Sequence, residues 1–232
     1  MLHKIDNIQN KKYTFIIKSD WIESIVDYDL VMENGVYKKY NSTLNGVEGE
    51  LIICNDLTKL DKFCNKTIQE TYQDYLEFIE KRDFTKEQWV YNILDGQSEQ
   101  DKILFRNEQI VIIPCYTWSN TQDIEKMHLL VFPLDKKIHS IRDLNSTHID
   151  MLEYSKEKTL EIIKDKYGLE RDLIKMYFHY SPSTYHLHIH FVQISNTDVN
   201  SSVEYSHELS SVIENLKINS DYYKLVKLNK RI

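Results

Sequence analysis

Three histidines, His186, His188 and His190, recur at every second position of the segment Tyr185–Val192. In a β-strand successive side chains point to opposite faces, so the three imidazoles are expected to share one face, about 6.5–7 Å apart. The other face would carry apolar side chains that pack into a core: Leu187, Ile189 and Phe191. The segment therefore predicts a strand that lines a groove with imidazoles.

Three interpretations of this pattern compete. The histidines could be surface residues of an amphipathic strand. They could chelate zinc, because His-x-His on a strand can bind that metal, although no carboxylate or cysteine stands at an obvious companion spacing. They could carry out phosphate chemistry: a neutral imidazole attacks phosphorus, while its neighbours bind the phosphate oxygens and protonate the leaving group.

The overall composition limits the partners. A formal net charge of −7, with no basic stripe, argues against a protein that tracks long nucleic acid. No run approaches the roughly 20 apolar residues of a membrane span, and no apolar targeting segment is evident near residue 1. The chain has three cysteines: Cys54, Cys64 and Cys115. Because their number is odd and their spacing matches no metal-ligand pattern, we interpret them as free thiols. We expect a soluble intracellular protein with a small anionic ligand.

The predicted fold class is α+β, with a small N-terminal domain over residues 1–84 and a catalytic domain over residues 85–232. The N-terminal elements are predicted from alternation, turn residues and helical spacing. They are a strand at Tyr13–Lys18, a hairpin of Leu30–Tyr40 with Glu48–Ile53, and a helix at Leu57–Glu80.

The C-terminal part predicts an antiparallel sheet with helices. Ser146 is a candidate N-cap of a long helix that ends at Tyr167 before Gly168. The other predicted elements are a short helix or turn at Trp89–Leu94, strands at Lys102–Phe105, Gln109–Pro114, Lys126–Phe132, Leu173–Tyr180 and His186–Ile194, and a second helix at Ser202–Leu216.

The pattern His-φ-His-φ-His-φ-φ, with φ apolar, is the signature of the histidine-triad (HIT) superfamily. Longer segments resemble one family of it, the scavenger mRNA-decapping enzymes. These segments are His179–His190, Gln88–Asp95, Ser140–Leu144 and Val212–Leu216. The resemblance covers residues 88–216 and implies a HIT-like C-terminal domain; the N-terminal domain is shorter than the family's.

The resemblance implies roles for the histidines. His188 would be the nucleophile that forms a nucleotidyl-histidine intermediate, with His186 and His190 as the flanking triad members. His179 and Ser183 match family positions that contact the phosphates. The family's mechanism requires no metal or other cofactor.

The resemblance also implies a binding site for 7-methylguanine. Trp89 matches the stacking tryptophan, whose aromatic face attracts the positively charged base, and Glu99 matches a glutamate that binds the guanine edge. Tyr116 would cover the other side of the base. The sequence departs from the family where Asp-Leu-Lys-Trp is usual: it has Cys115-Tyr-Thr-Trp118. The aspartate that binds the ribose and the lysine that binds a phosphate are replaced by Cys115 and Thr117.

The function implied is hydrolysis of the cap structure m7GpppN of short capped RNA fragments to 7-methylguanosine monophosphate and a nucleoside or oligonucleoside diphosphate. Two alternatives remain: another HIT-type hydrolase, acting on dinucleoside polyphosphates or phosphoramidates, and a cap-binding or nucleotide-binding regulator with weak turnover. The family resemblance further implies a homodimer located in the cytoplasm, the nucleus or both.

Overall fold

The computed structural model describes residues 3–6, 13–17, 28–33, 37–44, 47–54, 67–197, 199 and 201–231. The chain divides into two compact units between residues 66 and 67, whereas the sequence placed the division between residues 84 and 85. The observed boundary lies nearer residue 1 than the predicted one because strand β6 (Thr67–Glu70) pairs with strand β13 (Leu228–Arg231) inside the second unit. No described helix is long and apolar enough to cross a membrane.

The first unit contains a five-stranded sheet in the order β1-β2-β5-β4-β3. Its strands are β1 (His3–Asp6), β2 (Tyr13–Ile17), β3 (Tyr28–Glu33), β4 (Tyr37–Leu44) and β5 (Val47–Cys54). Strands β4 and β5 form an antiparallel hairpin, and β2 pairs parallel with β5. The predicted first strand of the hairpin, Leu30–Tyr40, was wrong as one element: it is divided between β3 and β4, which pair antiparallel with each other.

The helix predicted at Leu57–Glu80 is only partly present. Its first ten positions, 57–66, lie outside the described residues, and residues 67–70 form strand β6 instead. Helix α1 runs over Tyr72–Glu80 and begins at a capping box in which Thr71 and Asp74 bind each other's main-chain N–H groups. The prediction of one continuous helix was wrong because this capping box starts a new element within the apolar repeat.

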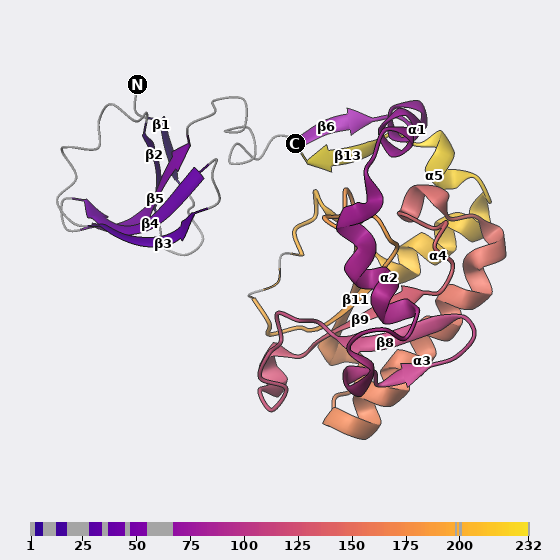
Figure 1. Cartoon of the computed structure of the whole chain (residues 1–232). Coiled ribbons are helices and arrows are strands. Elements are labelled where there is room, and N and C mark those ends of the chain that lie inside the picture. Colours follow the sequence, from indigo (N-terminus) through magenta and orange to yellow (C-terminus); the bar gives the residue numbers. More distant parts are fainter. Residues whose placement is uncertain are drawn as a thin grey trace. The chain divides into compact units, whose positions relative to one another are not determined.

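The second unit is built on a six-stranded antiparallel sheet in the order β12-β10-β11-β9-β8-β7. Its strands are β7 (Phe105–Arg106), β8 (Ile110–Pro114), β9 (His128–Pro133), β10 (Ile174–His179), β11 (Ile189–Gln193) and β12 (Ser206–Glu208). With the helices that pack on this sheet (Figure 1), the predicted α+β class is confirmed.

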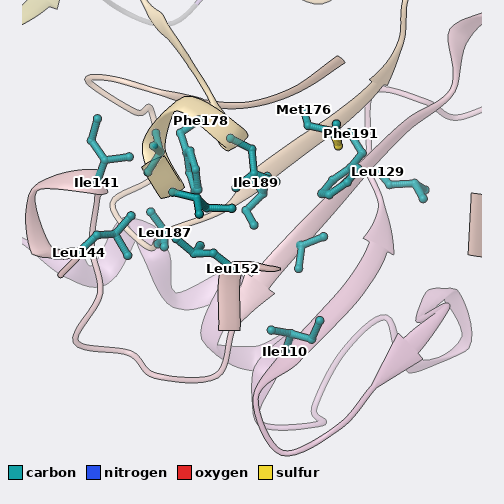
Figure 2. Packing of buried hydrophobic residues seen from close by; sticks show 14 of the residues in the cluster. Ile110, Leu129, Ile141, Leu144, Leu152, Met176, Phe178, Leu187, Ile189 and Phe191 are labelled. Carbon is teal, nitrogen blue, oxygen red and sulfur yellow. The ribbon is translucent and has the colours of Figure 1, made fainter. Parts of the chain in front are cut away.

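The two faces of this sheet carry different layers. One face, with Leu187, Ile189 and Phe191, packs against helices α3 (Ile149–Tyr167) and α4 (Leu209–Ile218) in the main core (Figure 2). The opposite face packs against helix α2 (Gln88–Leu94) in a smaller cluster that includes Leu130 and Phe132. Because side chains alternate along a strand, the histidines lie on the α2 face.

Several boundaries differ from the prediction. The strand predicted at Lys102–Phe105 is reduced to β7, Phe105–Arg106, because Gln100–Lys102 forms a 3-10 turn. Strand β11 begins at Ile189, so His186 and His188 belong to the segment before it. Helix α4 begins at Leu209, seven residues after the predicted start, because residues 206–208 pair with β10 as strand β12. Val203, predicted to be a helical apolar residue, lies outside the helix and is 94% exposed.

Helix α3 is delimited by local signals. Asn145 caps a short 3-10 turn (Ser146–His148) that leads into the helix, so the cap lies one residue before the predicted Ser146. Gly168 ends the helix with φ of 68°, a left-handed conformation that costs glycine little.

A buried arginine connects the two ends of the second unit. Arg142 is fully buried, and its guanidinium donates to the main-chain oxygens of Glu70, Tyr223 and Val226 at 2.6–2.7 Å. Glu70 lies in β6, whereas Tyr223 lies in the short helix α5 (Tyr222–Leu225) that precedes β13. The guanidinium is thereby satisfied, and the first and last segments of the unit are joined.

Candidate active site

Two adjoining hollows lie on the α2 face of the sheet. The first, here called the histidine cavity, has a volume of about 280 Å³ and is lined by four imidazoles: His128, His179, His188 and His190. The second, here called the side pocket, is lined by Trp89, Glu99, Pro114 and Tyr116. Trp89, Tyr116 and Ser183 line both hollows, so one ligand can extend from the side pocket into the histidine cavity.

His188 is oriented by the main chain. Its Nδ1 lies 2.8 Å from the carbonyl oxygen of His186, so Nδ1–H donates there and Nε2 keeps the lone pair in the neutral ring. Burial lowers the pKa of His188 and is opposed only by this hydrogen bond. The imidazole is therefore held neutral, in the tautomer that a nitrogen nucleophile needs.

His186 lies behind the histidine cavity and does not line it, although the resemblance implied that this residue, like His190, both positions the nucleophile and contacts the phosphates. Its side chain is completely buried, and its Nε2 lies 2.8 Å from the carbonyl oxygen of Pro133, to which it donates. The ring also meets Tyr91 edge to face. Burial lowers the pKa of His186 to about 4. His186 thus acts through its carbonyl, which its ring fixes in place for His188.

His190 and His128 form a buried pair. They come from neighbouring strands, and His128 Nε2 lies 2.9 Å from His190 Nδ1. Tyr177 of β10 stacks on His190 with an interplanar angle of 7°. The other ring nitrogen of His190, Nε2, is buried and has no hydrogen-bond partner among the described residues. This nitrogen belongs to a cavity-lining ring and is suited to bind an incoming ligand.

Cys115 and Thr117, the two positions that depart from the family's motif, extend the contacts of the His128–His190 pair. Thr117 Oγ1 lies 3.4 Å from His128 Nδ1 and 3.2 Å from Cys115 Sγ. Burial raises the pKa of the Cys115 thiol, which keeps it protonated at neutral pH. Cys115 is a buried free thiol, as predicted.

The predicted phosphate contacts, His179 and Ser183, also line the histidine cavity. The ring of His179 lies between two others, with centroids 4.3 Å from His190 and 4.0 Å from Tyr205. Ser183 is exposed and stands where the two hollows join.

The side pocket brings together the three predicted base-binding residues. Trp89 is 40% exposed and meets Phe132 edge to face, while Tyr116 is 79% exposed. Both rings therefore keep free surface for a ligand, unlike core aromatic residues. Glu99 has φ of 52°, a conformation unusual for a residue other than glycine, and lies 3.4 Å from Lys102 Nζ. Strained backbone of this kind is often found at ligand sites.

The sequence did not identify His128 as a site residue. It is the first residue of an apolar strand, and only the register of β9 against β11 places it diagonally beside His190. Its spacing of two from Leu130 and four from Phe132, which face the same side, was the available signal. No group of three or more His, Cys, Asp or Glu within the described part of the chain could hold a metal ion.

An antiparallel sheet with histidines at alternate positions against a cavity, and a long helix on its other face, defines a histidine-triad fold. The family described as scavenger mRNA decapping enzyme, C-terminal binding, matches residues 88–205. The m7GpppX diphosphatase of Ascaris suum is 34% identical, over 89% of this chain and 74% of its own length. This chain therefore belongs to the scavenger mRNA decapping enzyme family.

Two further relatives are also m7GpppX diphosphatases. The m7GpppX diphosphatase of Schizosaccharomyces pombe is 30% identical over 88% of this chain and 74% of its own length. That of Homo sapiens is 32% identical over 85% of this chain, which spans 63% of the human protein. A crystal structure of the aprataxin orthologue Hnt3 in complex with DNA aligns with 64% of this chain and 88% of its own, at 12% identity and a TM-score of 0.41.

Proposed function

We propose that this chain hydrolyses the cap structure m7GpppN of short capped RNA fragments. The products are 7-methylguanosine monophosphate and a nucleoside or oligonucleoside diphosphate. One observation carries the proposal: His188, held neutral with its lone pair on Nε2, lines a cavity that opens into the pocket of Trp89, Tyr116 and Glu99.

The side pocket suits a methylated guanine. The charged base would stack on Trp89, with Tyr116 on its other side, since aromatic faces attract cations. The carboxylate of Glu99 would accept hydrogen bonds from the N–H groups of the guanine edge. The phosphates would then lie in the histidine cavity, next to Ser183.

The reaction proceeds in two displacements. His188 Nε2 attacks the phosphorus nearest the methylguanosine; a P–N bond forms, and the P–O bond to the departing diphosphate breaks. A water molecule then attacks the same phosphorus, the P–N bond breaks, and 7-methylguanosine monophosphate leaves with His188 restored. The Nε2–H group of His190 would donate to the phosphate oxygens on which charge accumulates.

The direct test is incubation of the protein with methylated cap dinucleotide and separation of the products. Release of 7-methylguanosine monophosphate and a nucleoside diphosphate supports the proposal. Tight binding without product would instead support a cap-binding regulator. Cleavage of dinucleoside polyphosphates or phosphoramidates in preference to the methylated cap would support another HIT-type hydrolase.

Two further properties are proposed from the family resemblance: a homodimer, and a location in the cytoplasm, the nucleus or both. Sedimentation equilibrium tests the first, and a monomer at micromolar concentration would contradict it. Imaging of a tagged chain in its own cells tests the second.

A further inference from the structure

The histidine cavity contains little fixed charge for a polyphosphate. Its lining residues include one lysine, Lys126, and neither arginine nor carboxylate among the residues that the structure describes. Thr117 stands where the family has a phosphate-binding lysine. Within this lining, the imidazoles are the remaining groups that can become cationic and balance the charge of a phosphate.

We propose that the His128–His190 pair takes up one proton from solvent when a phosphate group enters the cavity, and that it binds the anion as an imidazole–imidazolium pair. This inference rests on the proposed function and identifies the phosphate-binding cation of the same site. The proton stays on the rings, and no covalent bond to the substrate is involved.

The geometry of the pair allows one shared proton to be added. With both rings neutral, a single hydrogen lies on the 2.9 Å line between His128 Nε2 and His190 Nδ1. With one proton added, both outer nitrogens, His128 Nδ1 and His190 Nε2, carry hydrogens, so His190 Nε2–H can donate to a phosphate oxygen from a pair that bears a positive charge. This buried Nε2 has no other partner among the described residues, so a ligand in the cavity would satisfy it.

Thr117 allows both protonation states to exist. In the neutral pair, when His128 Nε2–H donates to His190, His128 Nδ1 has a lone pair and accepts from the Thr117 hydroxyl. In the protonated pair His128 Nδ1 also carries a hydrogen, and the same hydroxyl oxygen accepts from it while donating to Cys115 Sγ. A lysine ammonium only donates, so it could not accept from a protonated pair.

The surroundings keep the pair neutral until a ligand arrives. From β10 it faces Tyr177 and His179, with Tyr205 behind His179. The remaining titratable groups of the cavity are His188, Lys126 and Cys115, and none of these groups is an anion at neutral pH. Burial lowers the pKa of His128 to about 4 and that of His190 well below 6.5. An entering phosphate would be the nearest anion and would raise both pKa values.

Isothermal titration calorimetry can count the protons. The probe is 7-methylguanosine monophosphate, titrated at about pH 7.5, where its phosphate is largely ionised, in buffers of different ionisation enthalpy. The nucleoside 7-methylguanosine is titrated in parallel, and the protons that its base takes up are subtracted. We expect the wild type to take up a measurable fraction of one proton per ligand bound, and this fraction should grow as the pH is lowered towards neutrality. His128→Gln leaves His190 as the single titratable ring of the pair, with no second imidazole to share the charge, so uptake should fall clearly below the wild-type value and affinity should fall about tenfold to a hundredfold.

Matched threonine variants separate charge from shape. Thr117→Val removes the hydroxyl at nearly constant volume and should abolish proton uptake, whereas Thr117→Ser should retain it. Thr121→Val changes an exposed threonine outside the histidine cavity and should behave as the wild type. Unchanged uptake in both His128→Gln and Thr117→Val would overturn the inference.

A second probe distinguishes this inference from the proposed function. Wild-type binding of 7-methylguanosine monophosphate without proton uptake overturns the inference and leaves cap recognition standing. Binding of inorganic pyrophosphate with uptake, but no binding of the methylated nucleotide, overturns cap recognition and supports the proton-dependent anion site. Absence of binding by both probes contradicts both proposals.

Discussion

The Nδ1 atom of His188 lies 2.8 Å from the main-chain oxygen of His186, so a backbone group rather than a carboxylate orients the proposed nucleophile. A neutral acceptor supplies orientation without the charge that would raise the pKa of the imidazole. Burial therefore dominates, and the pKa of His188 is lowered.

His188→Asn should abolish cap hydrolysis while binding of 7-methylguanosine monophosphate largely survives. Asparagine keeps polarity and approximate shape but has no nucleophilic nitrogen. The measurements are turnover of cap dinucleotide and calorimetric affinity, with His139→Asn, outside both hollows, as the control. Retention of more than a few per cent of the rate would remove His188 from the nucleophile role.

Excess chelator should leave the wild-type rate on cap dinucleotide unchanged. The proposed displacements use imidazole as the nucleophile and need no Lewis acid. The rate is compared before and after incubation with chelator. Activity that is lost and then restored by zinc would revive the interpretation of the histidines as metal ligands.

Trp89→Ala should weaken binding of the methylated cap more than binding of the unmethylated one. Base–aromatic stacking contributes about 1–3 kcal/mol, and the charge of the methylated ring adds a cation–π contribution. Affinities for both cap analogues are compared with those of Trp89→Phe, which should lose less. Equal losses for the two ligands would show that Trp89 does not select for methylation.

The free energy of unfolding should fall as the pH is lowered from about 6.5 towards 4. Burial lowers the pKa of both His186 and His128 to about 4, so between these pH values the unfolded chain binds more protons than the folded one. Stability then rises with pH in this window, by up to about 1.4 kcal/mol per pH unit for each histidine. Denaturant titrations at several pH values check the slope, which His128→Gln should reduce. An equal slope in the variant would contradict the prediction.

Thr117→Lys should make binding of 7-methylguanosine monophosphate less dependent on pH than in the wild type, and tighter above neutral pH, where the histidine pair is hardest to protonate. The lysine adds a fixed cation to the cavity, with a charge-assisted hydrogen bond of about 1.5–3 kcal/mol, and removes the hydroxyl that accepts from protonated His128. Affinity is measured across neutral pH, with Thr121→Lys as the control for added charge. A variant that binds like the wild type at every pH would show that position 117 does not face the phosphates.

Short capped fragments should be cleaved far faster than long capped RNA. The net charge of −7 and the shortage of basic residues at the cavity leave little attraction for a long phosphate backbone. Rates on cap dinucleotide and on a capped transcript of several hundred nucleotides make the comparison. Similar rates would point to an enzyme that acts on intact messages.

The sequence predicted those parts of the fold that local periodicity controls. Alternation placed Leu187, Ile189 and Phe191 in the core, and Gly168 marked the end of α3. The boundary errors came from pairing over long distances: residues 67–70 became a strand because β13, 160 positions later, lies beside them. The local pattern of a single sequence does not show which distant segment a strand will pair with.

The same distinction applies to the site. Motif resemblance identified seven of the residues that line the two hollows: Trp89, Glu99, Tyr116, His179, Ser183, His188 and His190. His128 needed the register between β9 and β11, and the role of His186 needed a main-chain hydrogen bond. Neither follows from residue type and spacing alone.

The buried guanidinium of Arg142 has a consequence for local unfolding. It binds carbonyl oxygens from β6 and from the segment before β13, so neither end can detach without leaving a charged donor unsatisfied. The two termini of the unit should therefore open as one cooperative foldon, and amide hydrogen exchange in β6 and β13 should report a single opening free energy. Fraying at either terminus is thereby coupled to the other, across more than 150 intervening residues.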